Sequence, residues 1–83
     1  MKLQKELGYV KTQFQNNLGA IKDYAPKLKA SGQYKDYETR LTWDCLYAFV
    51  GSGTICLWYE KYDCNDTHIT TVGKKALKEL GVI

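Results

Sequence analysis

Residues 54–80 constrain the fold more than any other part of the chain, because they carry two helical apolar patterns separated by a short polar segment. Apolar side chains recur at intervals of three and four over residues 55–62, and residues 69–80 repeat the pattern. The intervening Asp-Cys-Asn-Asp segment is typical of a turn, and Asp66 can cap the second helix by accepting backbone N–H groups. Two helices joined by so short a turn must cross steeply and form a helix-turn-helix unit.

The second predicted helix has a polar outer face that suits a groove of DNA. Amide and hydroxyl side chains match base edges and sugars, whereas lysines match phosphates. The residues expected to contact bases or sugars are Asn65, Thr67, Thr70 and Thr71, and those expected to contact phosphates are Lys74, Lys75 and Lys78. The alternative is a solvated face that only complements the helix dipole.

Residues 62–80 run Tyr-Asp-Cys-Asn-Asp-Thr-His-Ile-Thr-Thr-Val-Gly-Lys-Lys-Ala-Leu-Lys-Glu-Leu. They resemble the second half of the helix-turn-helix in sigma-factor region 4 and in small phage transcription regulators, where a Thr-rich recognition helix ends in a basic Ala-Leu-x-x-Leu run. Two positions depart from that pattern: Tyr59 replaces a small residue, and Asp63 replaces a turn glycine. Asp tolerates the left-handed conformation, whereas Tyr59 would push the helices apart. The resemblance implies a phage-type regulator that binds duplex DNA in the host cytoplasm.

An amphipathic helix is predicted over residues 3–18, where apolar side chains alternate in steps of three and four from Leu3 onwards. Gly8 and Gly19 weaken a helix. Either the helix ends near Gly19, or the two glycines admit close packing of another helix. We also expect that a homodimer, if one forms, uses this N-terminal helix.

Residues 37–50 predict a further long helix, and Pro26 predicts the start of a short helix over residues 26–30. The expected apolar face of the helix over residues 37–50 consists of Tyr37, Leu41, Cys45, Ala48 and Phe49, with Leu46 and Val50 beside it. Residues 1–83 are therefore expected to form a single all-α domain of four to five helices, ending in the helix-turn-helix-like pair. The alternative is an α+β winged helix with a hairpin at residues 54–66, because residues 54–62 are β-branched and aromatic.

The 83 residues suffice for one small domain with a marginal core. The chain is rich in aromatic residues, with seven Tyr, two Trp and two Phe. We therefore expect a core built on Trp43, Phe49, Trp58 and several tyrosines rather than on aliphatic side chains.

The net charge is +3, and it is unevenly distributed. Residues 1–35 carry seven Lys against Glu6 and Asp23, which gives +5. Residues 36–66 carry two basic and six acidic side chains, which gives −4, and residues 67–83 carry +2. A non-specific nucleic-acid coat is usually more basic, so this distribution permits protein binding at least as well as DNA binding.

Cys45, Cys56 and Cys64 are an odd number of cysteines without the spacing of a disulfide framework or a zinc knuckle. We expect reduced thiols and no metal, although Cys64 and His68 would be the first ligands of any zinc site. We expect no enzyme and no cofactor. Acidic residues beside Cys64 would keep its thiol protonated, and the Gly51-Ser-Gly53 segment lacks the lysine of a phosphate-binding loop.

No secretory signal and no apolar run of membrane-spanning length is present, which favours a cytoplasmic location. The leading hypothesis is the DNA-binding regulator. The alternative is a phage-encoded antagonist that binds a host protein of defence or lysis and binds no DNA. A second candidate surface combines tyrosines, most of them expected in the core, with lysines: Tyr9, Tyr24, Tyr34, Tyr37, Lys11, Lys22 and Lys35.

Overall fold

The computed structural model describes residues 4–83, which form α-helices and one π-helical turn and contain no β-strand. The elements are α1 (Gln4–Asn16), α2 (Leu18–Ser31), α3 (Tyr37–Cys45), the π-helix η1 (Leu46–Val50), α4 (Ser52–Tyr62) and α5 (Asp66–Glu79). The predicted all-α domain with five α-helices is confirmed. The winged-helix alternative is wrong, because residues 54–62 lie in α4. Leu3, where the first predicted helix begins, lies outside the described residues.

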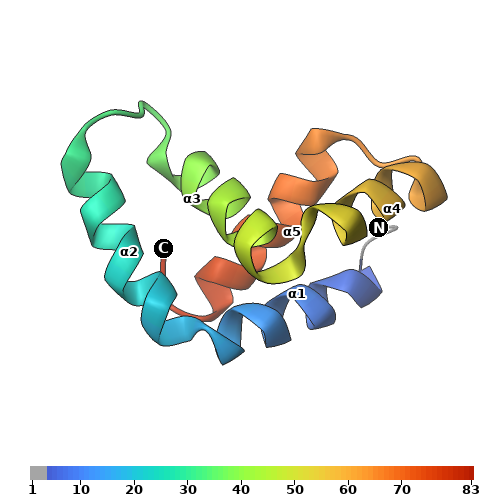
Figure 1. Cartoon of the computed structure of the whole chain (residues 1–83), viewed down its shortest axis with the longest axis horizontal. Helices are drawn as coiled ribbons and strands as arrows, with labels where there is room; N and C mark the ends of the chain where they lie inside the picture. Colours follow the sequence, from blue (N-terminus) through green and yellow to red (C-terminus); the bar gives the residue numbers. More distant parts are fainter. Residues whose placement is uncertain (1–3) are drawn as a thin grey trace.

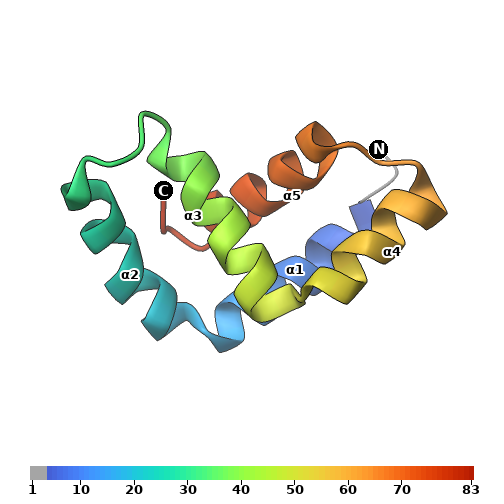
Figure 2. The ribbon, with the colours of Figure 1, turned by 45° about the horizontal axis from the view of Figure 1, so that its top comes forward.

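Helix α5 occupies the centre of the domain, and it packs mainly against α1 and α3 (Figures 1 and 2). Helix α4 packs mainly against η1. The chain between α4 and α5 turns back on itself, so that the two helices run in roughly opposite directions in both views. Helix α4 makes few contacts with α5, so α5 is held in place by α1 and α3 rather than by the first helix of the predicted helix-turn-helix pair.

The core is mainly aliphatic, which corrects the expectation of an aromatic core. Trp58 and Phe14 are the buried aromatic side chains among the described residues, whereas Trp43 and Phe49 are only partly buried. The other large buried side chains are Val10, Ile21, Leu28, Leu41, Leu46, Val50, Ile55, Ile69, Val72 and Leu77. Helical spacing places the aliphatic side chains on the inner face of each helix, where they fill the small core. Most tyrosines therefore lie outside the core.

The first helix ends at Asn16, and Asn17 separates it from α2. The side chain of Asn17 donates a hydrogen bond to the Gln13 carbonyl at 2.8 Å, while its own carbonyl accepts the Ile21 N–H at 3.1 Å. Space is open beside both Gly8 and Gly19, so neither glycine admits a close helix contact. The break at Asn17 therefore falls near the predicted end at Gly19.

The short helix predicted at residues 26–30 is wrong, because Pro26 lies inside α2, which begins eight residues earlier at Leu18. Proline lacks the N–H that an internal helical residue donates. Helix α2 nevertheless continues through it, and its buried side chains Ala25 and Leu28 lie on either side of the proline. The helix ends at Ser31, and its C-cap Gly32 has a left-handed conformation with φ of 66°.

The π-helix η1 changes the face that the third predicted helix buries. Val50 is buried, Phe49 is half-buried and Ala48 is exposed, whereas the sequence predicted Ala48 and Phe49 on the buried face. A hydrogen bond from the Gly51 N–H to the Leu46 carbonyl, at 2.9 Å, spans five residues and widens the turn. The wider turn delays the return of the buried face by one residue, from position 49 to position 50.

The apolar face of α1 packs against other helices of the same domain. Val10 and Phe14 are fully buried, and α1 packs against α5 and η1. A homodimer through the N-terminal helix stays a prediction, and it would have to use other residues of that helix. No helix of residues 4–83 is both long and apolar enough to cross a membrane.

Candidate functional site

The turn between α4 and α5 is well formed. Asp63 has a left-handed conformation with φ of 51°, at the position where the resembled families favour glycine. Asn65, and not Asp66, is the N-cap of α5: its side-chain oxygen accepts the His68 N–H at 2.9 Å. His68 Nδ1 in turn accepts the Asn65 N–H at 3.4 Å, which completes a capping box. The Asn65 side chain, predicted to contact DNA, is therefore committed to the helix start.

The predicted threonine contacts lie on the outer side of α5, with Thr67 and Thr71 exposed and Thr70 half-buried. The Thr71 hydroxyl donates to the Thr67 carbonyl at 2.7 Å, and the Thr70 hydroxyl donates to the Asp66 carbonyl at 2.9 Å. Such bonds to the preceding helical turn are common for threonine in helices. These hydroxyls keep acceptor lone pairs, but their protons already have partners within the helix.

The three predicted phosphate-contacting lysines have different surroundings. Lys75 and Lys78 are exposed, and Lys74 is half-buried. Lys74 Nζ lies 3.8 Å from the Asp36 carboxylate at the start of α3. A long ion pair that solvent still reaches contributes little stability. It nevertheless places a negative charge beside the lysine that would have to meet a phosphate.

Gly73 allows α5 to pack closely against α3, because it has no side chain. The sequence analysis did not predict this role of Gly73. A Cβ atom at this position would lie 2.5 Å from Thr42 Cγ2 and 3.2 Å from Leu46 Cδ1. Thr42 is fully buried and donates its hydroxyl to the Glu38 carbonyl at 2.7 Å. The available signal was a glycine in the middle of a strongly amphipathic helix, where glycine costs about 1 kcal/mol relative to alanine.

The three cysteines are free thiols in separate places. Cys45 and Cys64 are buried and Cys56 is exposed. The Cys64 thiol faces the Tyr62 carbonyl at 3.7 Å, while His68 Nδ1 faces the Asn65 N–H, so thiol and imidazole make hydrogen bonds to other groups. Within residues 4–83, His, Cys, Asp and Glu side chains do not gather in threes as metal ligands would.

The tyrosines of the second predicted surface are not in the core, which corrects the expectation for most of them. Tyr9, Tyr24 and Tyr34 are exposed, and Tyr37 is half-buried. Tyr24 donates its hydroxyl to Asp44 at 2.5 Å, which raises the pKa of Tyr24. Asp44 also pairs with Arg40, which lies 5.0 Å from the centre of the Tyr34 ring, and the predicted lysine Lys11 pairs with Glu79.

A second group of aromatic side chains lies on α3, η1 and α4, and we call Trp43, Tyr47 and Tyr59 the aromatic surface. Tyr47 is 52% exposed, and its ring stacks on that of Trp43 with 5.7 Å between centroids. Tyr59 lies near enough to Tyr47 and Cys56 for both to influence its titration. Burial, followed by a short hydrogen bond to Asp66, raises the pKa of the Tyr59 hydroxyl.

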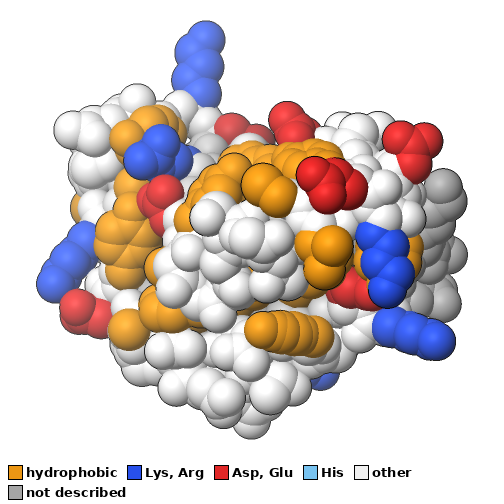
Figure 3. Space-filling view, turned by 45° about the vertical axis from the view of Figure 1, so that its right-hand side comes forward, with side chains coloured by type: hydrophobic (Ala, Val, Ile, Leu, Met, Phe, Trp, Pro, Cys, Tyr) orange, Lys and Arg blue, Asp and Glu red, His pale blue; other side chains and the backbone are white. Residues whose placement is uncertain are grey.

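The aromatic surface lies in the acidic part of the chain. Figure 3 views the side on which α4 lies, and hydrophobic side chains in its upper part lie between acidic ones. Glu60, Asp63 and Asp66 in and beside the α4–α5 turn form no ion pair with any described basic residue. The aromatic surface is therefore next to uncompensated negative charge.

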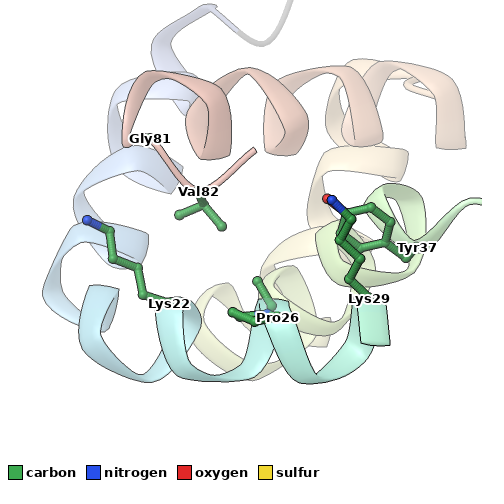
Figure 4. A pocket seen from close by; sticks show the side chains of 7 residues that line it. Lys22, Pro26, Lys29, Tyr37, Gly81 and Val82 are labelled. Carbon is green, nitrogen blue, oxygen red and sulfur yellow. The ribbon is translucent and has the colours of Figure 1, made fainter. Parts of the chain in front are cut away.

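Two cavities flank α2. The larger, of about 500 Å³, is wide open and lies between α2 and the C-terminal residues, where Figure 4 shows Pro26 and Val82 on opposite walls. Its other lining residues are Lys22, Ala25, Lys29, Tyr37 and Gly81. The smaller cavity, of about 270 Å³, is almost entirely apolar, and we call it the apolar slot. The apolar slot is lined by Ala20, Ile21, Tyr24, Asp44, Cys45, Ala48 and Phe49.

The chain matches no protein-family model, no curated protein and no solved structure. The resemblance to sigma-factor region 4 and small phage regulators therefore stays a prediction.

Proposed function

We propose that this protein is a small binding protein without catalytic activity, and that its aromatic surface docks a cationic protein partner. The observation that carries the proposal is the exposed Tyr47 ring stacked on Trp43, in a segment whose carboxylates Glu60, Asp63 and Asp66 form no ion pair with a described basic residue. Tyr and Trp are enriched among the residues that dominate protein interfaces. They bury a large area at small entropic cost because they have few rotatable bonds.

The charge around the aromatic surface supports a basic partner. Residues 36–66, which include α3, η1 and α4, carry a net charge of −4. Arginine and lysine side chains are attracted to the faces of Trp and Tyr rings and to carboxylates such as Asp66. The same charge would repel the phosphates of nucleic acid. This proposal corresponds to the antagonist of a host protein rather than to the transcription regulator.

Affinity capture with a matched pair of variants tests the proposal. Tyr47→Ala removes the most exposed ring of the aromatic surface, and Tyr9→Ala removes a ring of comparable exposure, 40%, on the basic helix α1. We expect wild type and the Tyr9 variant to retain the same protein from host lysate, and the Tyr47 variant to lose it. Equal capture by all three proteins would contradict the proposal.

The second candidate function is binding of duplex DNA by α5. The specific observations in its favour are the left-handed turn at Asp63 and the exposed Lys75 and Lys78 on the same helix as Thr67 and Thr71. A mobility-shift assay at about 50 mM salt tests it, because low salt strengthens phosphate contacts. If DNA binds, Lys75→Ala or Lys78→Ala should each reduce the salt slope by about 0.9. Absence of binding at low salt excludes this candidate.

A further inference from the structure

We infer that the larger cavity beside α2 binds a small organic acid that combines an apolar body with a carboxylate. The cavity volume of about 500 Å³ lies within the roughly 300–1,000 Å³ of small-molecule sites. None of the lining residues belongs to the aromatic surface, so this inference goes beyond the proposed function and does not depend on it.

The lining of the cavity is cationic. Lys22 and Lys29 line it, and no acidic side chain does. Neither lysine forms an ion pair with an acidic group that the structure describes. The acidic neighbour of Lys22 in sequence, Asp23, is paired with Lys27 at 3.1 Å. The cavity therefore attracts anions and repels cations.

Lys29 and Tyr37 form the end of the cavity that suits the carboxylate. The Lys29 ammonium lies 5.6 Å from the centre of the Tyr37 ring, whose negative face attracts the charge. Figure 4 shows both side chains pointing toward Val82 across the cavity. The hydroxyls of Tyr24 and Tyr59 bond to aspartates, whereas that of Tyr37 has no partner among the described residues. An ammonium and a hydroxyl can thus donate to the two oxygens of one carboxylate.

The middle of the cavity suits the apolar body of the ligand. Pro26 and Val82 lie on opposite walls, and Ala25 also lines the cavity (Figure 4). Pro26 is exposed and Val82 is half-buried, so both present apolar surface that a ligand would cover. Removal of such surface from water favours binding of an apolar group.

The wall opposite α2 is held in place by the end of α5. Gly81 has a left-handed conformation with φ of 78°, and its N–H donates to the Lys78 carbonyl at 3.1 Å. The Val82 N–H donates to the Leu77 carbonyl at 2.9 Å. These two bonds form the Schellman motif, which turns the chain back at a helix end. The Val82 backbone is therefore fixed by α5 without a ligand.

The test uses phenylpropionate as the probe and phenylpropionamide, which has the same apolar body and no charge, as the matched control. Titration of phenylpropionate into isotope-labelled protein should shift the backbone amide signals of Lys29, Tyr37 and Val82. The neutral amide should bind about 10-fold more weakly, because hydrogen bonds to a charged group are the stronger ones. Absence of these shifts, or equal binding of the acid and the amide, would overturn the inference.

Variants assign the binding to the two donors. Lys29→Gln should weaken binding of phenylpropionate about 10-fold, and Tyr37→Phe, which keeps the ring and its packing, about 2- to 10-fold. Lys75→Gln removes the same charge at an exposed position of α5 outside the lining and should bind like wild type. Tyr47→Ala should also bind the probe like wild type, which separates this site from the aromatic surface.

The Lys75 and Tyr37 variants keep the inference falsifiable. Equal weakening in the Lys29 and Lys75 variants would indicate an effect of net charge alone and would overturn the site. Tyr37→Phe decides the matter if Lys29→Gln does not fold, and unchanged binding in that variant would then exclude the donor pair.

Discussion

The two tryptophans of the chain occupy different environments, and their roles differ accordingly. Trp58 on α4 is 5% exposed and belongs to the core. Trp43 on α3 is only partly buried and supports the exposed ring of Tyr47. Trp58 is therefore a core residue, whereas Trp43 belongs to the aromatic surface.

Replacement of Trp58 by alanine should destabilise the domain by about 3–5 kcal/mol, because a large side chain is lost from a closed core. Trp43→Ala should cost less, because its ring is already in contact with solvent. Urea denaturation monitored by circular dichroism measures the loss of unfolding free energy in both variants. Equal losses would show that the packing of Trp43 is as extensive as that of Trp58.

The three thiols should react at different rates with an aromatic disulfide reagent. Cys56 is exposed and should react first in the native protein. Cys45 should not react, because burial, together with the nearby Asp44 charge, raises its pKa to about 12 and the reactive thiolate is not formed. Cys64 is also buried. The expected result is one fast thiol in the native protein and three in denaturant, and a fast Cys45 would contradict it.

At the scale of the elements, the tight crossing of α3 and α5 depends on Gly73. Gly73→Ala would place Cβ against the Thr42 methyl at 2.5 Å. Overpacking of this kind costs about 1–3 kcal/mol, which exceeds or offsets the gain of about 1 kcal/mol from replacing a helical glycine. We expect a net loss of stability in thermal denaturation.

A second substitution shows whether this contact is the cause. Thr42→Ser removes the methyl group that the new Cβ would meet, while it keeps a hydroxyl for the Glu38 carbonyl. The double variant should be more stable than the sum of the two single changes predicts. Strict additivity would mean that the loss in Gly73→Ala arises elsewhere.

The start of α3 should give the domain a pH-dependent contribution. Asp36 caps α3 and accepts the Thr39 hydroxyl at 2.6 Å and the Thr39 N–H at 3.1 Å, which lowers the pKa of Asp36 below its ordinary value. Because the folded value is the lower one, the stabilisation is present above the ordinary Asp pKa of about 4 and is lost as pH falls through the folded value.

Asp36→Asn keeps a capping oxygen and removes the titration. Wild type should be the more stable protein near neutral pH, and the difference should disappear in acid. Urea denaturation over a pH series measures it. A difference that does not change with pH would exclude this role of Asp36.

The helices were predictable because their apolar side chains recur at helical spacing, and the turn at Asp63 was predictable because aspartate tolerates the left-handed region. The residues that the third predicted helix buries near its C-terminal end were not predictable. The bond between Gly51 and Leu46 arises from packing in three dimensions, and it moves the buried position from Phe49 to Val50. Pro26 misled the prediction, because tertiary packing of Ala25 and Leu28 carries α2 through it.

The candidate sites were predictable in part. The exposure of Lys75, Lys78, Thr67 and Thr71 follows from their positions opposite the apolar face of α5. The pairing of Lys74 with Asp36 does not, because the two residues are 38 positions apart in the chain. The aromatic surface was missed for the same reason, since it joins residues of three elements.

At the scale of the whole molecule, charge and shape divide the domain. The principal extents are 36 × 25 × 21 Å, and the radius of gyration of 12.3 Å is close to the roughly 12 Å of a compact chain of this length. Basic α1 and α2 precede the acidic segment of α3, η1 and α4. A partner approaching the aromatic surface therefore meets attraction if it is cationic, and more strongly at low salt.

Helix α2 has a cavity on each flank and packs less extensively against its neighbours than α5 does, and this has a consequence for the order in which the domain opens. Segments with few buried contacts open locally at low free energy, whereas central elements open only with the whole domain. Amide hydrogens of α2 should exchange with deuterium well before those of residues 69–77 in α5.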